Sequence, residues 1–153
     1  MKLVKEANAV CLYQMDPQEA AMLQGLVKNF PFTAMQEGEI SRTEATPEAL
    51  ERDKLLNESL VEYRESLTTL AAQLVAPERF KPQAKGVVMT ISSEERERLL
   101  QILNDIRVGC WNALGQPASL EPPASGATDH EHKYFALLNL AGYFEHSLLV
   151  GES

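Results

Sequence analysis

Residues 92–115, SSEERERLLQILNDIRVGCWNALG, are the stretch on which the rest of the fold depends. Ser92 is typical of a helix N-cap, and Glu95, three residues later, is the second half of a capping box. Gly115 suits the first position beyond a helix, and Pro117 prevents the helix from continuing. The apolar residues between these signals recur at spacings of three and four, which predicts one buried helix face: Leu99, Ile102, Leu103, Ile106, Cys110 and Leu114.

Polar residues stand beside this buried face. Arg107 lies between Ile106 and Val108, and a guanidinium close to a core needs a carboxylate nearby. One interpretation is a structural or solvated polar edge, and the other is a site that binds a ligand or a partner. The candidate residues for either role are Asn104, Asp105 and Arg107 in this stretch and Glu145 near the C-terminus.

Three segments carry a resemblance to a known family. Residues 99–115, LLQILNDIRVGCWNALG, resemble the LNDLR-type helix of a bacterial family of uncharacterised proteins, a domain of unknown function best known from actinobacteria. MDPQEAAMLQGLV (residues 15–27) and YFALLNLAGYFEHSLL (residues 134–149) resemble the same family, in the same order. The resemblance implies an all-helical fold and no established activity. Because family members are encoded near the Clp protease adaptor, it also implies a link to regulated proteolysis.

Length and composition limit the classes of protein to consider. The chain has 153 residues, enough for a single domain over residues 1–153. Its net charge of −8 argues against nucleic acid as a partner, because phosphate binding needs clustered Lys and Arg. Cys11 and Cys110 lie on apolar segments and indicate buried free thiols in a reducing compartment. No signal peptide and no run of about 18 apolar residues is present, so we expect a cytoplasmic protein without membrane attachment.

The remaining elements are expected on both sides of the central helix. Residues 9–15 and 86–91 predict two strands, and Asp16 with Pro17 and Glu19 predicts the start of a helix. Residues 46–76 and 131–150 predict two further helices, whereas residues 31–46 and 77–85 predict connections. Residues 116–129, rich in Pro, Gly and Ser, predict a flexible connection.

The two strand-cap-helix units match at a constant offset of 76 residues, Asp16 with Glu19 against Ser92 with Glu95. This offset reflects either an old duplication or two similar solutions to one local problem. The two strands are expected to pair as a ribbon whose open edges can pair across a dimer. The predicted fold is mainly α, a helical bundle of about four to five helices with a small two-stranded β ribbon.

One cluster contains residues of the kind that bind metals. Asp129, His130, Glu131 and His132 are consecutive, and His146 follows further on. Imidazole and carboxylate are good ligands for zinc and related metals. Asp129 also has a simpler role as a helix N-cap. No phosphate-binding glycine loop and no G-x-S-x-G motif occurs, and we expect no cofactor.

These patterns support three hypotheses of different kinds. The first is a non-enzymatic interaction or regulatory protein that binds a partner protein, and one form of this hypothesis makes it a homodimer. Its support is the last helix, which is apolar on nearly every side. The second is a metal-dependent enzyme that uses His130, His132 and His146. The third is a transcription regulator, since a helical domain with a ribbon can resemble a winged helix.

Overall fold

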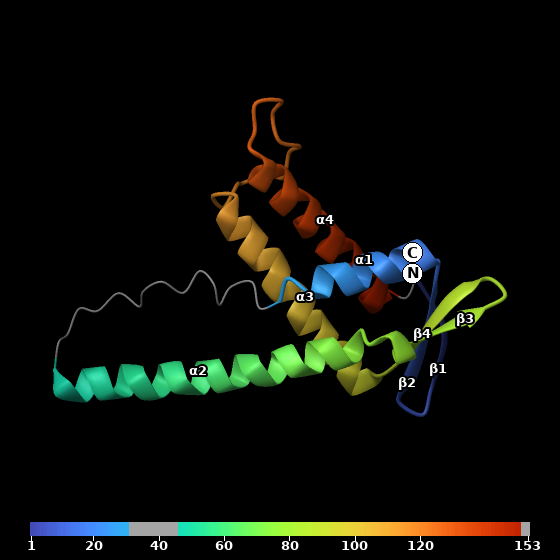
Figure 1. The fold of residues 1–153 in the computed structure, drawn as a ribbon, viewed down its shortest axis with the longest axis horizontal. Helices are drawn as coiled ribbons and strands as arrows, with labels where there is room; N and C mark the ends of the chain where they lie inside the picture. The colour runs from blue at the N-terminus through green and yellow to red at the C-terminus, as the bar shows by residue number, and fades with distance from the viewer. Residues whose placement is uncertain (31–45, 151–153) are drawn as a thin grey trace.

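A computed structural model describes residues 1–30 and 46–150 and gives an α+β fold over them (Figure 1). The expectation of a mainly α bundle with a two-stranded ribbon is therefore wrong, and so is the all-helical fold that the resemblance implies. Four α-helices and one four-stranded antiparallel sheet lie within these residues. The strands are β1 (Lys2–Ala7), β2 (Val10–Met15), β3 (Phe80–Gln83) and β4 (Gly86–Ser92), with a short 3-10 turn, η2 (Pro77–Arg79), before β3. The helices are α1 (Pro17–Val27), α2 (Pro47–Leu74), α3 (Ser93–Ala113) and α4 (Asp129–Val150).

The sheet has the order β1-β2-β4-β3. The predicted pairing of β2 with β4 is confirmed, and Tyr13 lies opposite Met89 in the antiparallel register. The sequence did not predict β1 and β3, which flank this central pair. Both edges that were expected to pair across a dimer are therefore covered within the chain. The β1–β2 turn places Asn8 and Ala9 at positive φ, 52° and 61°, as in the tight turns that favour hairpins.

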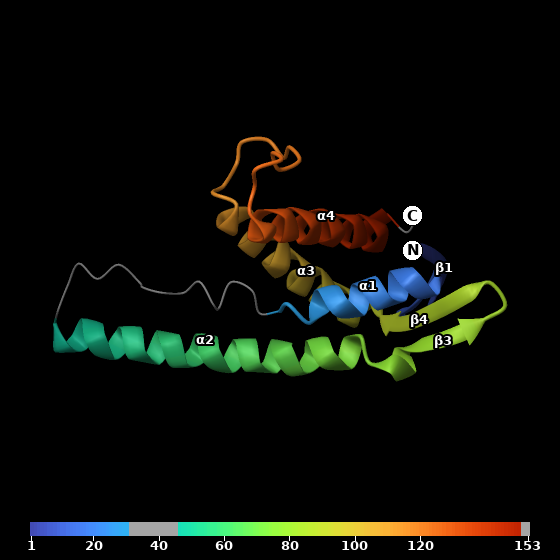
Figure 2. The same cartoon turned by 45° about the horizontal axis from the view of Figure 1, so that its top comes forward.

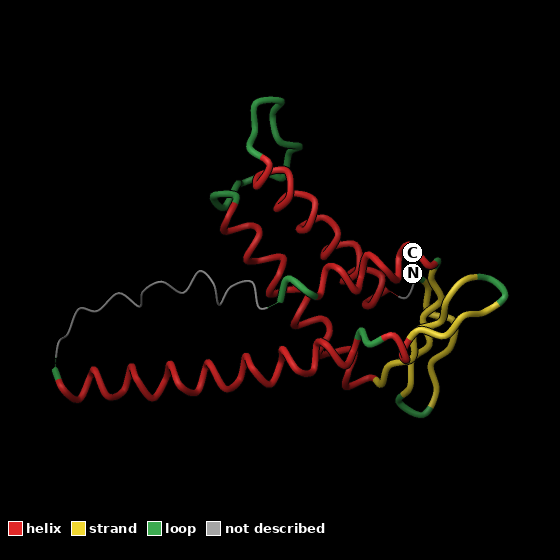
Figure 3. Tube along the Cα trace, in the orientation of Figure 1, coloured by secondary structure: helices red, strands yellow, loops and turns green. Residues whose placement is uncertain are grey.

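One face of the sheet packs against the helices. The side chains of β2 and β4 that point toward the helices are buried: Cys11, Tyr13, Met15, Met89 and Ile91. Figure 3 shows the sheet at one end of the molecule, with the helices on one side of it. The predicted inner face of α3 is confirmed over most of its length: Leu99, Ile102, Leu103, Ile106 and Cys110 are buried in the same core, and Leu114, at the C-cap, is partly buried. α3 is thus the central helix of the fold.

The described chain consists of two halves with the same order of elements. Residues 1–74 form β1-β2-α1-α2, and residues 77–150 form β3-β4-α3-α4. Asp16 and Ser92 cap the first helix of each half, each in a complete capping box, and these residues are 76 positions apart. α2 and α4 end at Leu74 and Val150, which are separated by the same 76 positions. The offset predicted from two local signals therefore extends over both halves.

α2 is the element that departs most from its expected packing. It is continuous over 28 residues, but its buried residues are Ala49, Leu67, Ala71 and Leu74. Leu56 and Tyr63, which share the three-and-four spacing of the buried Leu67 and Leu74, are 53% and 52% exposed. Figures 1 and 2 both show the N-terminal part of α2 extending away from the body of the molecule. We call residues 47–66 the arm.

Two connections complete the chain. The connection predicted over residues 31–46 lies, except for Thr46, outside the described residues. The one predicted over 116–129 ends where α4 begins, at Asp129. Thr128, rather than Asp129, caps α4, because the Glu131 amide donates to Thr128 Oγ1 at 3.2 Å. None of the helices in the described ranges is long and apolar enough to cross a membrane.

Candidate partner-binding surface

The outer side of α3, opposite its buried face, carries Arg107, Val108 and Trp111. Val108 and Trp111 are each 38% exposed, and half of the Arg107 side chain is exposed. α4 packs along α3 (Figure 2) and supplies the buried Leu138 and the mostly buried Glu145 beside this surface. Exposed apolar and cationic side chains thus lie together on the central helix of the fold.

An ion pair fixes Arg107 on this surface. Arg107 Nη1 donates to Glu145 Oε2 at 3.2 Å. The predicted need for a nearby carboxylate is confirmed, although Arg107 is half exposed rather than buried. Burial raises the pKa of Glu145 above its ordinary value, and the charge of Arg107 acts against this shift. Within the described chain, the buried Glu145 Oε1 has no hydrogen-bond partner, so Arg107 is the main compensation for this carboxylate.

A groove of about 400 Å³ lies next to this pair. The buried Leu138 of α4 contributes to it, and the connection after α3 contributes three further residues. We call this site the α3–α4 groove. It is lined by Arg107, Val108, Trp111, Pro117, Ala118, Leu120 and Leu138. Most of its lining is apolar and one residue is charged, the composition expected of a site that receives an apolar side chain and orients it with a polar contact.

The connection that lines the groove is anchored to the end of α3. Gly115 has a φ of +86°, as its predicted position beyond the helix requires. The Gly115 amide donates to Asn112 O at 3.0 Å and the Gln116 amide to Trp111 O at 2.9 Å, which together form a Schellman motif. Trp111 Nε1 donates to Pro117 O at 3.1 Å. These bonds hold the first part of the connection against the indole ring.

Asn104 and Asp105 lie on the other side of α3, toward α2. They border a hollow of about 470 Å³ between the two helices. We call this site the α2–α3 hollow. It is lined by Phe30, Leu60, Tyr63, Arg64, Leu67, Gln101, Asn104, Asp105 and Val108. The structure therefore divides the four predicted polar candidates between two sites, with Arg107 and Glu145 at the groove and Asn104 and Asp105 at the hollow. Val108 borders both.

The candidate metal ligands do not come together. His130 and His132 lie in the first turns of α4, whereas His146 lies near its end. With a helical rise of about 1.5 Å per residue, His132 and His146 are about 21 Å apart along the helix axis. Among the described residues, no group of three His, Cys, Asp or Glu side chains is placed to hold a metal ion. His130 instead stacks on Tyr134, with 6.0 Å between the ring centroids.

Cys110 is buried in the core, as predicted. Burial raises the pKa of its thiol to about 11. The thiol is therefore protonated near neutral pH and is a poor nucleophile.

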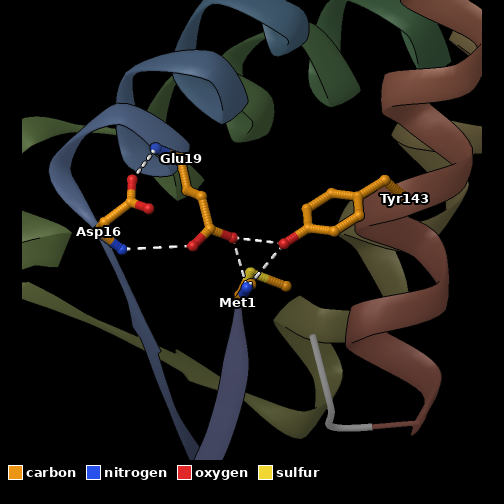
Figure 4. Close-up of polar contacts among 4 residues, drawn as sticks. All are labelled: Met1, Asp16, Glu19 and Tyr143. Atoms are coloured by element: carbon orange, nitrogen blue, oxygen red, sulfur yellow. Dashed lines mark hydrogen bonds and ion pairs between the residues drawn. The ribbon is translucent and has the colours of Figure 1, made fainter.

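A further polar cluster joins the first strand to the first and last helices, and the sequence did not reveal it (Figure 4). Glu19 accepts hydrogen bonds from the amino group of Met1 and from Tyr143, whose hydroxyl lies 2.5 Å from Glu19 Oε2. Partial burial acts to raise the pKa of Glu19, but the bonds from Met1, Tyr143 and the Asp16 amide lower it below its ordinary value. Burial and the bond to Glu19 raise the pKa of Tyr143 to about 12. These bonds connect the start of β1 to α1 and α4.

Comparisons with family models, with curated proteins and with solved structures gave no match for this chain.

Proposed function

We propose that this protein is a non-catalytic interaction or regulatory protein that binds a segment of a partner protein in the α3–α4 groove. The observation that carries the proposal is the exposed Trp111 beside the ion-paired Arg107 at the edge of an apolar groove. Tryptophan and arginine are the residues most enriched among those that dominate protein–protein binding energy. The groove suits a partner segment with one large apolar side chain, for Trp111 and Leu120, and a carboxylate for Arg107.

The fixed position of both anchors supports this proposal. Glu145 holds Arg107, and Pro117 O holds the Trp111 indole, so binding orders few additional side chains. Side chains that are ordered before binding lower its entropic cost. The guanidinium also has five donor hydrogens, which leaves capacity for a carboxylate beside the bond to Glu145.

The test is affinity capture from a lysate of the source organism with matched baits, read by quantitative mass spectrometry. We expect a partner that wild-type protein captures and that Trp111→Ala and Arg107→Ala capture at least about tenfold less. Leu149→Ala is the control, because Leu149 is 70% exposed on α4 and does not line the groove. Equal capture of every partner by all four baits contradicts the proposal.

The proposed process is regulated proteolysis, and its support is the resemblance to a family encoded near the Clp protease adaptor. Calorimetric titration of the protein with that adaptor tests this part separately. We expect binding that Trp111→Ala weakens and Leu149→Ala leaves unchanged. Absence of binding at concentrations of about 100 µM rules out a direct link of this kind.

A further inference from the structure

The arm carries an apolar stripe that the body of the molecule covers at one end. Residues 56, 60, 63, 67, 70 and 74 of α2 are Leu, Leu, Tyr, Leu, Leu and Leu, and their spacing alternates between four and three. This is the spacing of the contact positions in a two-helix coiled coil. Leu67 and Leu74 are buried against the body, whereas Leu56 and Tyr63 on the same stripe are more than half exposed. The part of the stripe around Leu56 and Tyr63 therefore lies outside the surface that covers Leu67 and Leu74, while Ala49, in line with it seven residues before Leu56, is buried.

The second half of the chain shows what covers the corresponding helix. α4 lies along α3, which is 21 residues long. α1, the counterpart of α3, has 11 residues, whereas α2 has 28. α1 is too short to cover α2 along its length, and α2 makes its main contacts with α3. Among the described residues, no helix lies along the stripe of the arm as α3 lies along α4.

The charges of the arm favour a second arm as that helix. Glu51, Glu58 and Glu65 recur every seven residues on the side opposite the stripe. The positions that flank the stripe carry no carboxylate, although the chain has a net charge of −8. These flanking residues are Leu50, Arg52, Asn57, Ser59, Arg64 and Ser66. Two arms can therefore approach along the stripe without bringing their glutamates together.

We propose that a second copy of this chain docks on the arm, with the two α2 helices antiparallel. A parallel pair would place Asp53, which lies in the stripe, against Asp53 of the second copy. In the antiparallel register, Leu56 lies opposite Leu60 of the second copy. Asp53 lies opposite Tyr63 of the second copy, next to that copy's Arg64. Each arm tip then points toward the α2–α3 hollow of the other copy, where Val108 offers apolar surface and Asn104 offers an amide. The contact is two-fold symmetric and closed.

Sedimentation equilibrium on wild-type protein and on two variants tests this dimer. Leu55 and Leu56 are adjacent, of the same type and similarly exposed, at 58% and 53%, but only Leu56 lies in the stripe. We expect wild type and Leu55→Asp to be dimers at micromolar concentration. We expect Leu56→Asp to have a dissociation constant at least about 100-fold higher, because it places a charge in the contact. Far-UV circular dichroism should be equal for all three, since both leucines are exposed.

Three results would overturn the proposal: a wild-type protein that stays monomeric at about 100 µM, equal weakening by both variants, or no weakening by Leu56→Asp. Tyr63→Glu is a second variant on the stripe and should dissociate the dimer as Leu56→Asp does. Trp111→Ala should leave the dimer intact, because Trp111 lines the α3–α4 groove and not the hollow. The dimer and the partner-binding function therefore fail or succeed separately.

Discussion

The two halves of this chain repeat the order strand, strand, helix, helix but use their second helix differently. In residues 77–150, α3 and α4 have 21 and 22 residues and pack along each other. In residues 1–74, α1 stops after 11 residues, and α2 runs past it as an arm. At the end of α1, Asn29 Nδ2 donates to the carbonyls of Gly25 and Leu26, each at 3.2 Å, and so caps the last turn of the helix. The length of the first helix thus determines whether the second is buried or offers its stripe to other molecules.

The halves agree more closely at the start of their first helices. Glu19 and Glu95 both occupy the third position of a capping box. Each also binds a cationic group that precedes or begins the hairpin of its half, the Met1 amino group for Glu19 and the Arg79 guanidinium for Glu95. Arg79 donates to both carboxylate oxygens of Glu95, at 2.8 and 2.6 Å. One glutamate per half therefore joins hairpin to helix.

The largest expected difference in stability is between a substitution in the core of α4 and a substitution in the arm. Phe144 in α4 is fully buried, and Phe144→Ala should lower the free energy of unfolding by about 3–5 kcal/mol through lost contacts and a cavity. Leu56→Ala in the arm should change the stability of dilute protein by no more than about 0.5 kcal/mol. Urea unfolding of both variants measures the difference. Similar losses would mean that the arm belongs to the folded core.

The next effect concerns the glutamate of the second half. The hydrogen bonds from Arg79 hold the pKa of Glu95 at about 2, well below its ordinary 4.5. The stability that this carboxylate provides is therefore present above about pH 4.5 and is lost as the pH falls toward 2. Glu95→Gln should cost about 1–3 kcal/mol near neutral pH, and its difference from wild type should shrink over that acidic range.

Glu94→Gln is the matched control for this change, since Glu94 is exposed in the same turn of α3. Unfolding curves at several pH values should show little effect of the control. A Glu95→Gln cost that stays constant down to about pH 2 would mean that the Arg79 bond does not stabilise the fold.

A smaller effect is expected in the cluster of the first half. Tyr143→Phe removes the hydroxyl that bonds Glu19 and lies 2.9 Å from the Met1 amino group, and it should cost about 1 kcal/mol. Tyr63→Phe on the exposed arm should cost less than about 0.5 kcal/mol. Thermal unfolding distinguishes the two variants. If both variants unfold at the same temperature as the wild type, the cluster does not stabilise the contact between α4 and the first half.

The fold is predictable where the sequence signal is local. Ser92 with Glu95 and Asp16 with Glu19 fixed two helix starts, because a capping box lies within four residues. β1 and β3 could not be predicted in this way, because KLVKEA mixes charges and FKPQ includes a proline. Both form strands through hairpins with stronger neighbours.

The candidate site was predictable only in part. The character of Arg107 predicted that a carboxylate would be near, and Glu145 was among the candidates. The groove depends on Trp111 meeting Pro117 across the end of α3, with Leu138 arriving from another helix. The Glu19 cluster joins residues 1, 19 and 143, a separation that no sequence pattern marks. Tertiary contacts, rather than local propensity, create both sites.

The most direct test is whether α4 is packed into the fold while the arm of α2 is exposed. Amide hydrogen exchange on dilute protein, read by mass spectrometry of peptides from α2 and α4, measures this difference. We predict that peptides from residues 47–63 exchange much faster than peptides from residues 134–148, because Ala49 is the only buried residue in the first range, whereas five residues of α4 are buried. Raising the protein concentration should slow exchange in the arm alone. Equal protection of the two helices in dilute protein would contradict the account.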